Sequence, residues 1–163
     1  MATAFDTFQQ YADIAFEGQI NDLSMADVET YVSEGVTPFG RAIFQGEAVK
    51  SGVLATAEAG MFIGISVMKP VSVASSFPGN GNDAGANRDG FESSNLSFGR
   101  IWVRSADGAN RGQQAYAVPE TGEITNEEGG NHLLPNARFM TDATAGGLVL
   151  VQVQGKGLTT LGA

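Results

Sequence analysis

The feature that most constrains this chain is a series of short β-type segments separated by turn residues. Apolar and polar residues alternate over residues 28–33, 62–68, 96–104 and 148–154, and a period of two is typical of strands. Glycine, Asn and Asp fall between the segments, and the 22 glycines in 163 residues are nearly twice the usual share of about 7%. Strands roughly ten residues apart predict an all-β fold, a small β-barrel or a jelly-roll-like sandwich.

One of these predicted strands, residues 96–104, has two faces of different chemistry. Ile101 and Val103 form an apolar face. The opposite face carries three large side chains: Arg100, Trp102 and Arg104. Trp and Arg are enriched at interaction hot spots, so this second face is a candidate protein interface. The alternative is that Trp102 packs in the core while its arginine neighbours extend their charged ends to solvent.

The last predicted strand and the longest predicted loop differ clearly in pattern. In residues 148–154 the alternation predicts that three valines point inward: Val149, Val151 and Val153. Residues 77–90 are rich in Gly, Asn and Asp and offer almost nothing to bury. We therefore expect a loop there, between strands.

The first 35 residues differ from the rest of the chain. Five large apolar side chains lie within twelve positions: Phe5, Phe8, Tyr11, Ile14 and Phe16. Their spacing permits a short helix or an extended segment. We expect residues 1–35 to form an N-terminal arm of a single domain whose β-barrel or jelly-roll body is residues 36–163. The arm either packs on its own barrel or reaches a neighbouring subunit.

The charge balance excludes two classes of partner. Nine basic and eighteen acidic residues give a net charge of −9. A protein that grips nucleic acid through its phosphates needs a basic stripe, which this sequence lacks. The same acidity disfavours attachment to an anionic membrane surface. The longest apolar stretches are far shorter than the roughly 20 residues needed to span a bilayer, so we expect a soluble protein.

Residue types that build common metal and nucleophilic sites are scarce. The chain has no Cys, which excludes disulfides, thiolate metal sites and Cys nucleophiles. Its single histidine, His132, follows Gly129, Gly130 and Asn131 and is expected to be an exposed loop side chain. One histidine also excludes zinc sites built from several histidines.

Two further groups of polar residues are expected to lie in solvated loops rather than to form a metal-binding or catalytic site. Four oxygen-bearing side chains lie close together in the sequence: Asn82, Asp83, Asn87 and Asp89. Their spacing is not that of an EF-hand. Glu127 and Glu128 stand in a glycine loop, whereas acid–base work requires a pocket that separates two pKa values. We predict no catalytic, cofactor-binding or metal-binding residue, and a protein that is not an enzyme.

Several phrases in order along the chain resemble the cement, or decoration, proteins of tailed-bacteriophage capsids. The order of the phrases carries the resemblance, which spans about residues 11–153. The phrases are FEGQIND (16–22), TYVSEG (30–35), PFGRAIFQG (38–46), GMFIGISV (60–67), FGRIWV (98–103), GQQAYAV (112–118), LPNARF (134–139) and GGLVLVQV (146–153). The long loop at residues 77–90 departs from the usual pattern.

This resemblance implies a small β-barrel or jelly-roll-like virion protein on the outer capsid surface. Such a protein would bridge neighbouring major capsid proteins and stabilise the shell, as a homotrimer rather than a dimer. It has no catalytic residues to carry over and needs no cofactor. Its partners would be the major capsid protein and copies of itself, and neither nucleic acid nor membrane.

Two other functions remain open at the level of sequence. The first is a carbohydrate-binding jelly roll on the virion surface, in which Trp102 is the stacking residue beside Asp or Asn ligands. The second is a hydrolase, which needs two carboxylates facing one cleft.

Overall fold

The structure is a computed structural model that describes residues 15–56, 58, 60–69 and 86–162. Four of the predicted arm contacts lie outside these residues: Phe5, Phe8, Tyr11 and Ile14. Residues 77–85 of the predicted loop also lie outside them.

The described residues form an all-β fold, as the alternation predicts, with a single turn of 3-10 helix (η1, Leu23–Met25). None of their helices is long and apolar enough to cross a membrane. The strands are β1 (Asp27–Ser33), β2 (Thr37–Pro38), β3 (Ala42–Gln45), β4 (Ser51–Leu54), β5 (Met61–Ser66), β6 (Ala86–Asn87), β7 (Glu92–Arg104), β8 (Gln114–Ala117), β9 (Ile124–Thr125), β10 (His132–Phe139), β11 (Leu148–Gln154) and β12 (Gly157–Leu158).

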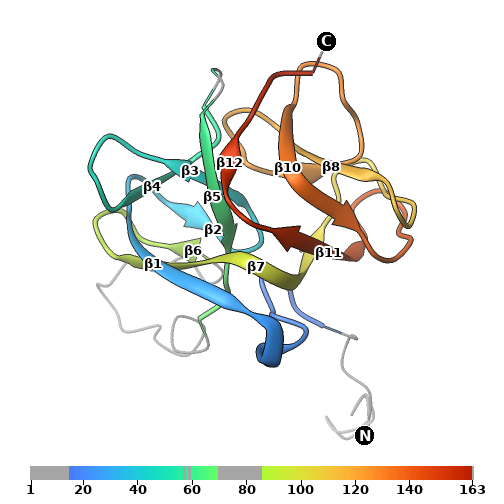
Figure 1. The fold of residues 1–163 in the computed structure, drawn as a ribbon, viewed down its shortest axis with the longest axis horizontal. Helices are drawn as coiled ribbons and strands as arrows, with labels where there is room; N and C mark the ends of the chain where they lie inside the picture. The colour runs from blue at the N-terminus through green and yellow to red at the C-terminus, as the bar shows by residue number, and fades with distance from the viewer. Residues whose placement is uncertain (1–14, 57, 59, 70–85, 163) are drawn as a thin grey trace, which may run out of the picture.

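Five strands close into a β-barrel. They are hydrogen-bonded in the order β5–β3–β4–β1–β7, and β5 also pairs with β7 where Ile65 stands opposite Leu96. The 13-residue strand β7 is long enough to belong to two sheets. Its second half continues into the order β7–β11–β10–β8–β9. Figure 1 shows the barrel strands β1, β3 and β4 on one side of β7, and β8, β10 and β11 on the other.

The interior follows the predicted alternation where β7 meets β11. Ile101 and Val103 are fully buried. The three inward valines of β11 are fully buried as well: Val149, Val151 and Val153. Cα partners across an antiparallel pair point to the same side of the sheet, and Val149 faces Val103 while Val151 faces Ile101. The outward residues of β7 therefore form the opposite surface of the same sheet.

Strand β1 lies ahead of residue 35 and is one of the barrel strands, paired with β4 and β7. Its buried residues include Tyr31 and Ser33, whereas Val28 and Val32 are exposed. Tyr31 packs with buried isoleucines of β3 and β5, and the Ser33 hydroxyl is 3.1 Å from that of Thr37. The two buried polar residues of β1 therefore find partners inside, and two of its valines face outward.

The expectation that His132 is an exposed loop residue is wrong. His132 is the first residue of β10 and is fully buried. Its ring packs at 5.2 Å, between centroids, from that of Phe44, and its Nε2 lies 2.6 Å from the carbonyl oxygen of Thr56. A carbonyl oxygen only accepts hydrogen bonds, so Nε2 carries the proton. The glycine-rich context concealed the start of a strand that other segments cover.

Within the predicted loop at residues 77–90, Ala86–Asn87 forms the short strand β6, which pairs with β2.

A charged cluster attaches the segment after β11 to β1. The Lys156 ammonium group pairs with the Glu29 carboxylate and donates to the Tyr31 hydroxyl at 3.0 Å. Lys50 lies 3.7 Å from the other Glu29 oxygen. The hydrogen bond from Lys156 lowers the pKa of Glu29 below its ordinary value, with a smaller contribution from Tyr31.

This lowered pKa predicts the pH dependence of one stability contribution. The folded state favours the Glu29 carboxylate, so the contribution is present above the ordinary Glu pKa of about 4.3 and is lost as the pH falls through the lower folded pKa. We expect the free energy of unfolding of Glu29→Gln to depend less on pH between about pH 5 and pH 3. Urea denaturation at a series of pH values measures it, and parallel curves for the two proteins would contradict it.

Candidate protein interface

The root of the arm, residues 16–21, is hydrogen-bonded along the second half of β7, on the edge opposite the one that pairs with β11. The Gly18 amide donates to the Trp102 carbonyl at 2.8 Å, and the Asn21 amide donates to that of Arg100 at 2.9 Å. The Trp102 amide donates back to Gln19 at 2.9 Å. The sequence-predicted arm residue Phe16 precedes this ladder and is 55% exposed. The root is therefore anchored by backbone, while its first aromatic side chain stays available to a partner.

Gly18 allows this attachment because its backbone is in the left-handed region, with φ of +81°. A Cβ atom there would lie 2.9 Å from the Met68 amide nitrogen and from Phe39 Cβ. The Gly18 carbonyl accepts from that Met68 amide at 2.8 Å. The arm root is thus held between β7 and the end of the segment that follows β5.

The outward side chains of β7, β11 and β10 form one surface, which we call the arginine–tryptophan face. It is defined by Arg100, Trp102, Arg104, Arg138 and Gln152, whereas Leu150, on the same side of the sheet, is buried. Register aligns Arg100 with Gln152 and Gln152 with Arg138, which gives a polar row across three strands. Trp102 stands opposite Leu150 in the next row. The structure therefore brings the three predicted residues of β7 onto one outward surface.

The three predicted residues of this face differ in how they are held. Trp102 is half-buried, and its indole N–H donates to the Asn21 side-chain oxygen at 3.1 Å. Arg104 lies 3.6 Å from the Glu17 carboxylate and donates to the Gly146 carbonyl at 3.0 Å. Arg100 is exposed and has no ion-pair partner among the described residues. Part of the face is thus pre-ordered by the arm root, whereas Arg100 is exposed beside the Asp22 carboxylate without a direct ion pair to it.

Glu17 adds a partly desolvated charge to the arm root. Burial raises the pKa of Glu17 above its ordinary value, and the nearby guanidinium groups of Arg41 and Arg104 oppose that rise. Its Oε1 atom is buried and has no hydrogen-bond partner within the described part of the chain. The root therefore combines backbone pairing with a carboxylate that is held beside Arg104.

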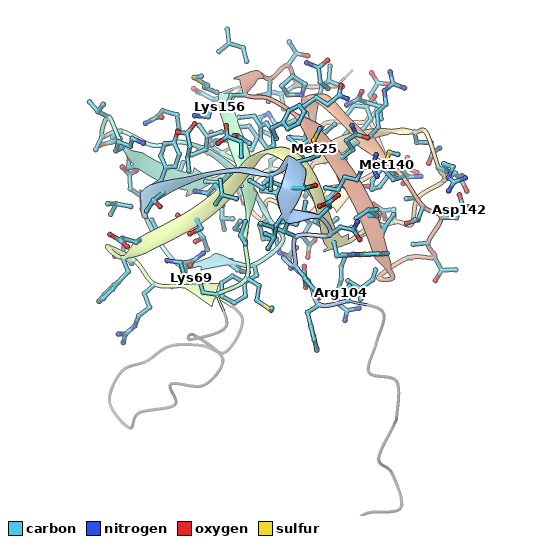
Figure 2. All side chains as sticks on the ribbon, turned by 60° about the horizontal axis from the view of Figure 1, so that its bottom comes forward. Met25, Lys69, Arg104, Met140, Asp142 and Lys156 are labelled. Atoms are coloured by element: carbon cyan, nitrogen blue, oxygen red, sulfur yellow. The ribbon has the colours of Figure 1, made fainter. Side chains whose placement is uncertain are left out.

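A small hollow lies beside the arginine–tryptophan face and was not predicted from the sequence. Its volume is about 130 Å³, and its lining residues are Asp22, Met25, Phe98, Gly99, Arg100 and Gln152. Met25 is 62% and Phe98 39% exposed, so its apolar part is open to a partner. Figure 2 shows Met25 directed outward at the middle of this side of the molecule. Phe98 stands two residues before Arg100 and so lies on the same face of β7, which the alternation of the sequence indicated.

The described pockets offer little for catalysis or metal binding. A second pocket of about 290 Å³ is lined by Arg41, Arg104, Ser105, Ala106, Glu123 and Gly146. Each of the two pockets has a single carboxylate in its lining, whereas the hydrolase alternative needs two acids in one cleft. No group of three or more His, Asp or Glu side chains within the described ranges is placed to hold a metal ion.

Solved structures include chains that resemble this one. One match is to a chain in the solved structure "The capsid of Myoviridae Phage XM1". It covers 94% of this chain and 98% of that one, with 19% sequence identity and a TM-score of 0.69. This likeness shows a shared fold. A weaker likeness, with 9% identity and a TM-score of 0.46, covers 80% of this chain and 95% of a chain in "head fiber gp8.5 N base in bacteriophage phi29". No curated protein matches the sequence.

A family comparison extends over nearly the whole chain. The family described as "Structural cement protein (E217 gp24/Pam3 gp6)" matches residues 5–154. The match includes the arm residues from Phe5 onward, the barrel and the arginine–tryptophan face. The chain therefore belongs to the family of phage structural cement proteins, and it is a structural component of the virion at the outer surface of the capsid.

Proposed function

We propose that this chain binds the outer capsid surface as a homotrimer and bridges neighbouring major capsid proteins. Family membership supports the association with capsid proteins. The observation that carries the proposal is the arm root, which is hydrogen-bonded to β7 at Trp102 and Arg100 and ends at the exposed Phe16. A segment anchored at one end can transmit force from a neighbouring subunit into the barrel, as a bridging protein requires.

The contacts between subunits come from two groups of residues in this proposal. The arm contributes Phe5, Phe8, Tyr11, Ile14 and Phe16. The arginine–tryptophan face contributes Arg100, Trp102 and Arg104. Trp and Arg side chains dominate binding energy in many interfaces. A stable interface of ordinary size removes about 1,600 Å² of surface from solvent, and several linked contacts per trimer raise the overall affinity further.

The proposed role is adhesive and needs no catalysis. Burial of apolar surface and repetition of the contact over many copies supply the stabilisation. A net charge of −9 suits a protein on the solvent side of the shell, since packaged DNA would repel it inside. Neither a cofactor, a metal ion, nucleic acid nor a membrane enters the mechanism.

Reconstitution tests this proposal. Purified chain is added to capsids that lack it, and bound protein is measured after sedimentation, with heat-induced DNA release as the stability readout. We expect a free mass about three times 16.9 kDa, saturable binding and release at a higher temperature. Leu158→Ser is a control variant that should assemble and bind like the unchanged chain. Leu158 is 81% exposed on β12 and distant in sequence from both contact groups. A monomer that does not bind would contradict the proposal.

A further inference from the structure

We propose that the hollow at Met25 and Phe98, together with Arg100 and Arg138, receives the N-terminal arm (residues 1–14) of a second copy of this chain. The inference rests on the proposed function and deepens it, because it names the surface on which the arm docks. Three observations carry it: the size of the hollow, the distribution of charge, and the direction in which the arm root runs.

The hollow fits one aromatic side chain. Its volume of about 130 Å³ is close to that of an engineered apolar cavity of about 150 Å³ that binds benzene. Met25 and Phe98 supply apolar walls, and an exposed methionine adjusts its shape to the group it meets. The arm offers three aromatic rings: Phe5, Phe8 and Tyr11.

The charges of the arm and of the receiving surface are complementary. Residues 1–14 contain Asp6 and Asp13 and no Lys or Arg. Arg100 and Arg138 lie in one row on either side of Gln152, and neither forms an ion pair in the described part of the chain. The hollow also carries one carboxylate, Asp22, so these three side chains together leave the receiving surface with one excess positive charge. Strand spacing puts their backbones about 10 Å apart.

The spacing of acidic and aromatic residues in the arm matches this surface. If the arm is extended, Asp6 and Phe8 lie on the same side, about 7 Å apart along the chain. A ring in the hollow would then bring a carboxylate close to Arg100, which itself lines the hollow. Carboxylate–guanidinium pairs are among the stronger hydrogen-bonded contacts, and Arg forms them with two parallel bonds.

The direction of the arm root favours a second copy over the same chain. Residues 18–21 run antiparallel to β7, with Ile20 opposite Ile101. Moving from Asn21 back to Gly18 therefore leads toward Arg104 and away from Phe98. Figure 2 shows Arg104 at the end of the molecule where the described chain begins, apart from Met25. An arm that enters its own hollow must reverse, whereas one that continues outward reaches a neighbour.

Such an exchange is compatible with a closed ring. Each copy gives its arm to the next and receives one from the previous, so the contact joins two different surfaces. Contacts of this type generate rings when the rotation closes. The seven residues 8–14 span at most about 25 Å when extended, so the receiving hollow of the neighbouring copy must lie within about that distance of residue 15.

Disulfide trapping tests the assignment, because the chain contains no Cys of its own. Phe8→Cys and Met25→Cys are made in separately tagged chains, which are co-expressed and then oxidised. The matched control pairs Phe8→Cys with Leu158→Cys. Leu158 is more exposed than Met25, at 81% against 62%, so random collision favours the control. We expect roughly tenfold more doubly tagged covalent dimer with Met25→Cys, because docking raises the local concentration of the two thiols.

The outcomes separate the inference from the function on which it rests. If the Phe8→Cys chain is oligomeric and binds capsids but couples no better to Met25→Cys than to Leu158→Cys, the docking surface is wrong and the proposed function stands. If Phe8→Cys and Met25→Cys in one chain form a disulfide at monomer mass, the arm docks on its own barrel. A wild-type chain that forms no oligomer contradicts both.

A charge exchange provides an independent check. Arg100→Glu is expected to shift the population from oligomer to monomer, and Asp6→Arg in the same chain is expected to restore it. Arg88→Glu is the control, since Arg88 lies beside Phe91, outside this face. Sedimentation velocity reads out the populations. Failure of Asp6→Arg and of Asp13→Arg to restore assembly would overturn the pairing with the arm.

Discussion

Deleting residues 1–14 is expected to turn the oligomer into a folded monomer and to reduce capsid binding by at least about a hundredfold. The deletion removes four of the five arm contacts: Phe5, Phe8, Tyr11 and Ile14. Truncation of one hot-spot aromatic costs about 2 kcal/mol or more of binding free energy. The loss of several contacts therefore exceeds a factor of a hundred. Sedimentation velocity measures assembly, and co-sedimentation with capsids measures binding.

The deletion ends at residue 14 so that the barrel is left intact. Ala15 is buried, and Gly18, Gln19 and Asn21 pair with β7, so removal of more residues would also disturb the body. Thr3→Ser and Thr7→Ser in the full chain form the matched control, since they change the arm while keeping its five large apolar side chains. If the deleted chain forms an oligomer with the same number of copies and binds capsids as before, the proposed role of the arm is contradicted.

Gly64→Ala is expected to lower the free energy of unfolding by at least about 3 kcal/mol. A Cβ atom at Gly64 would lie 2.5 Å from the Leu96 carbonyl oxygen and 2.8 Å from its carbon. Both are backbone atoms of β7, and the next residue, Ile65, pairs with Leu96 to close the barrel. Relief of the clash would separate β5 from β7. Since a domain has only about 5–15 kcal/mol of net stability, much of the purified variant should be insoluble or partly unfolded.

Urea denaturation measures this effect, with Gly129→Ala as the control. A Cβ atom at Gly129 would meet nothing within 4 Å, so that variant should retain wild-type stability. Equal stability of Gly64→Ala and Gly129→Ala would show that β5 and β7 do not approach each other as closely as the closed barrel requires.

Much of the strand content could be predicted because alternation is a local property. Val149, Val151 and Val153 alternate with larger or polar residues, and all three are buried. The same local rule placed Arg100, Trp102 and Arg104 on one face. The partners of the strands could not be predicted in this way. The closing pair Ile65–Leu96 joins residues 31 apart in the sequence, and only the folded chain defines it.

Two features of the interior and the surface illustrate the limits of local patterns. Glycine and asparagine before His132 indicated a loop, yet β8 and the segment after β12 pair with this residue and bury it. Met25 lies in a 3-10 turn capped by Asp22, whose carboxylate accepts from the Ser24 amide at 2.9 Å. That turn puts Met25 beside Phe98, although 73 positions separate them in the sequence. Contacts between distant segments determine both sites, so no sequence window contains them.

Cryo-electron microscopy of particles that contain this chain tests the central claim most directly. The fold described here has a shape that can be placed in density, with β7 shared by two sheets. The account predicts three copies around each binding position on the outside of the shell, each touching more than one major capsid protein. Particles without the chain, or with it inside the shell or on a single capsid subunit, would contradict the account.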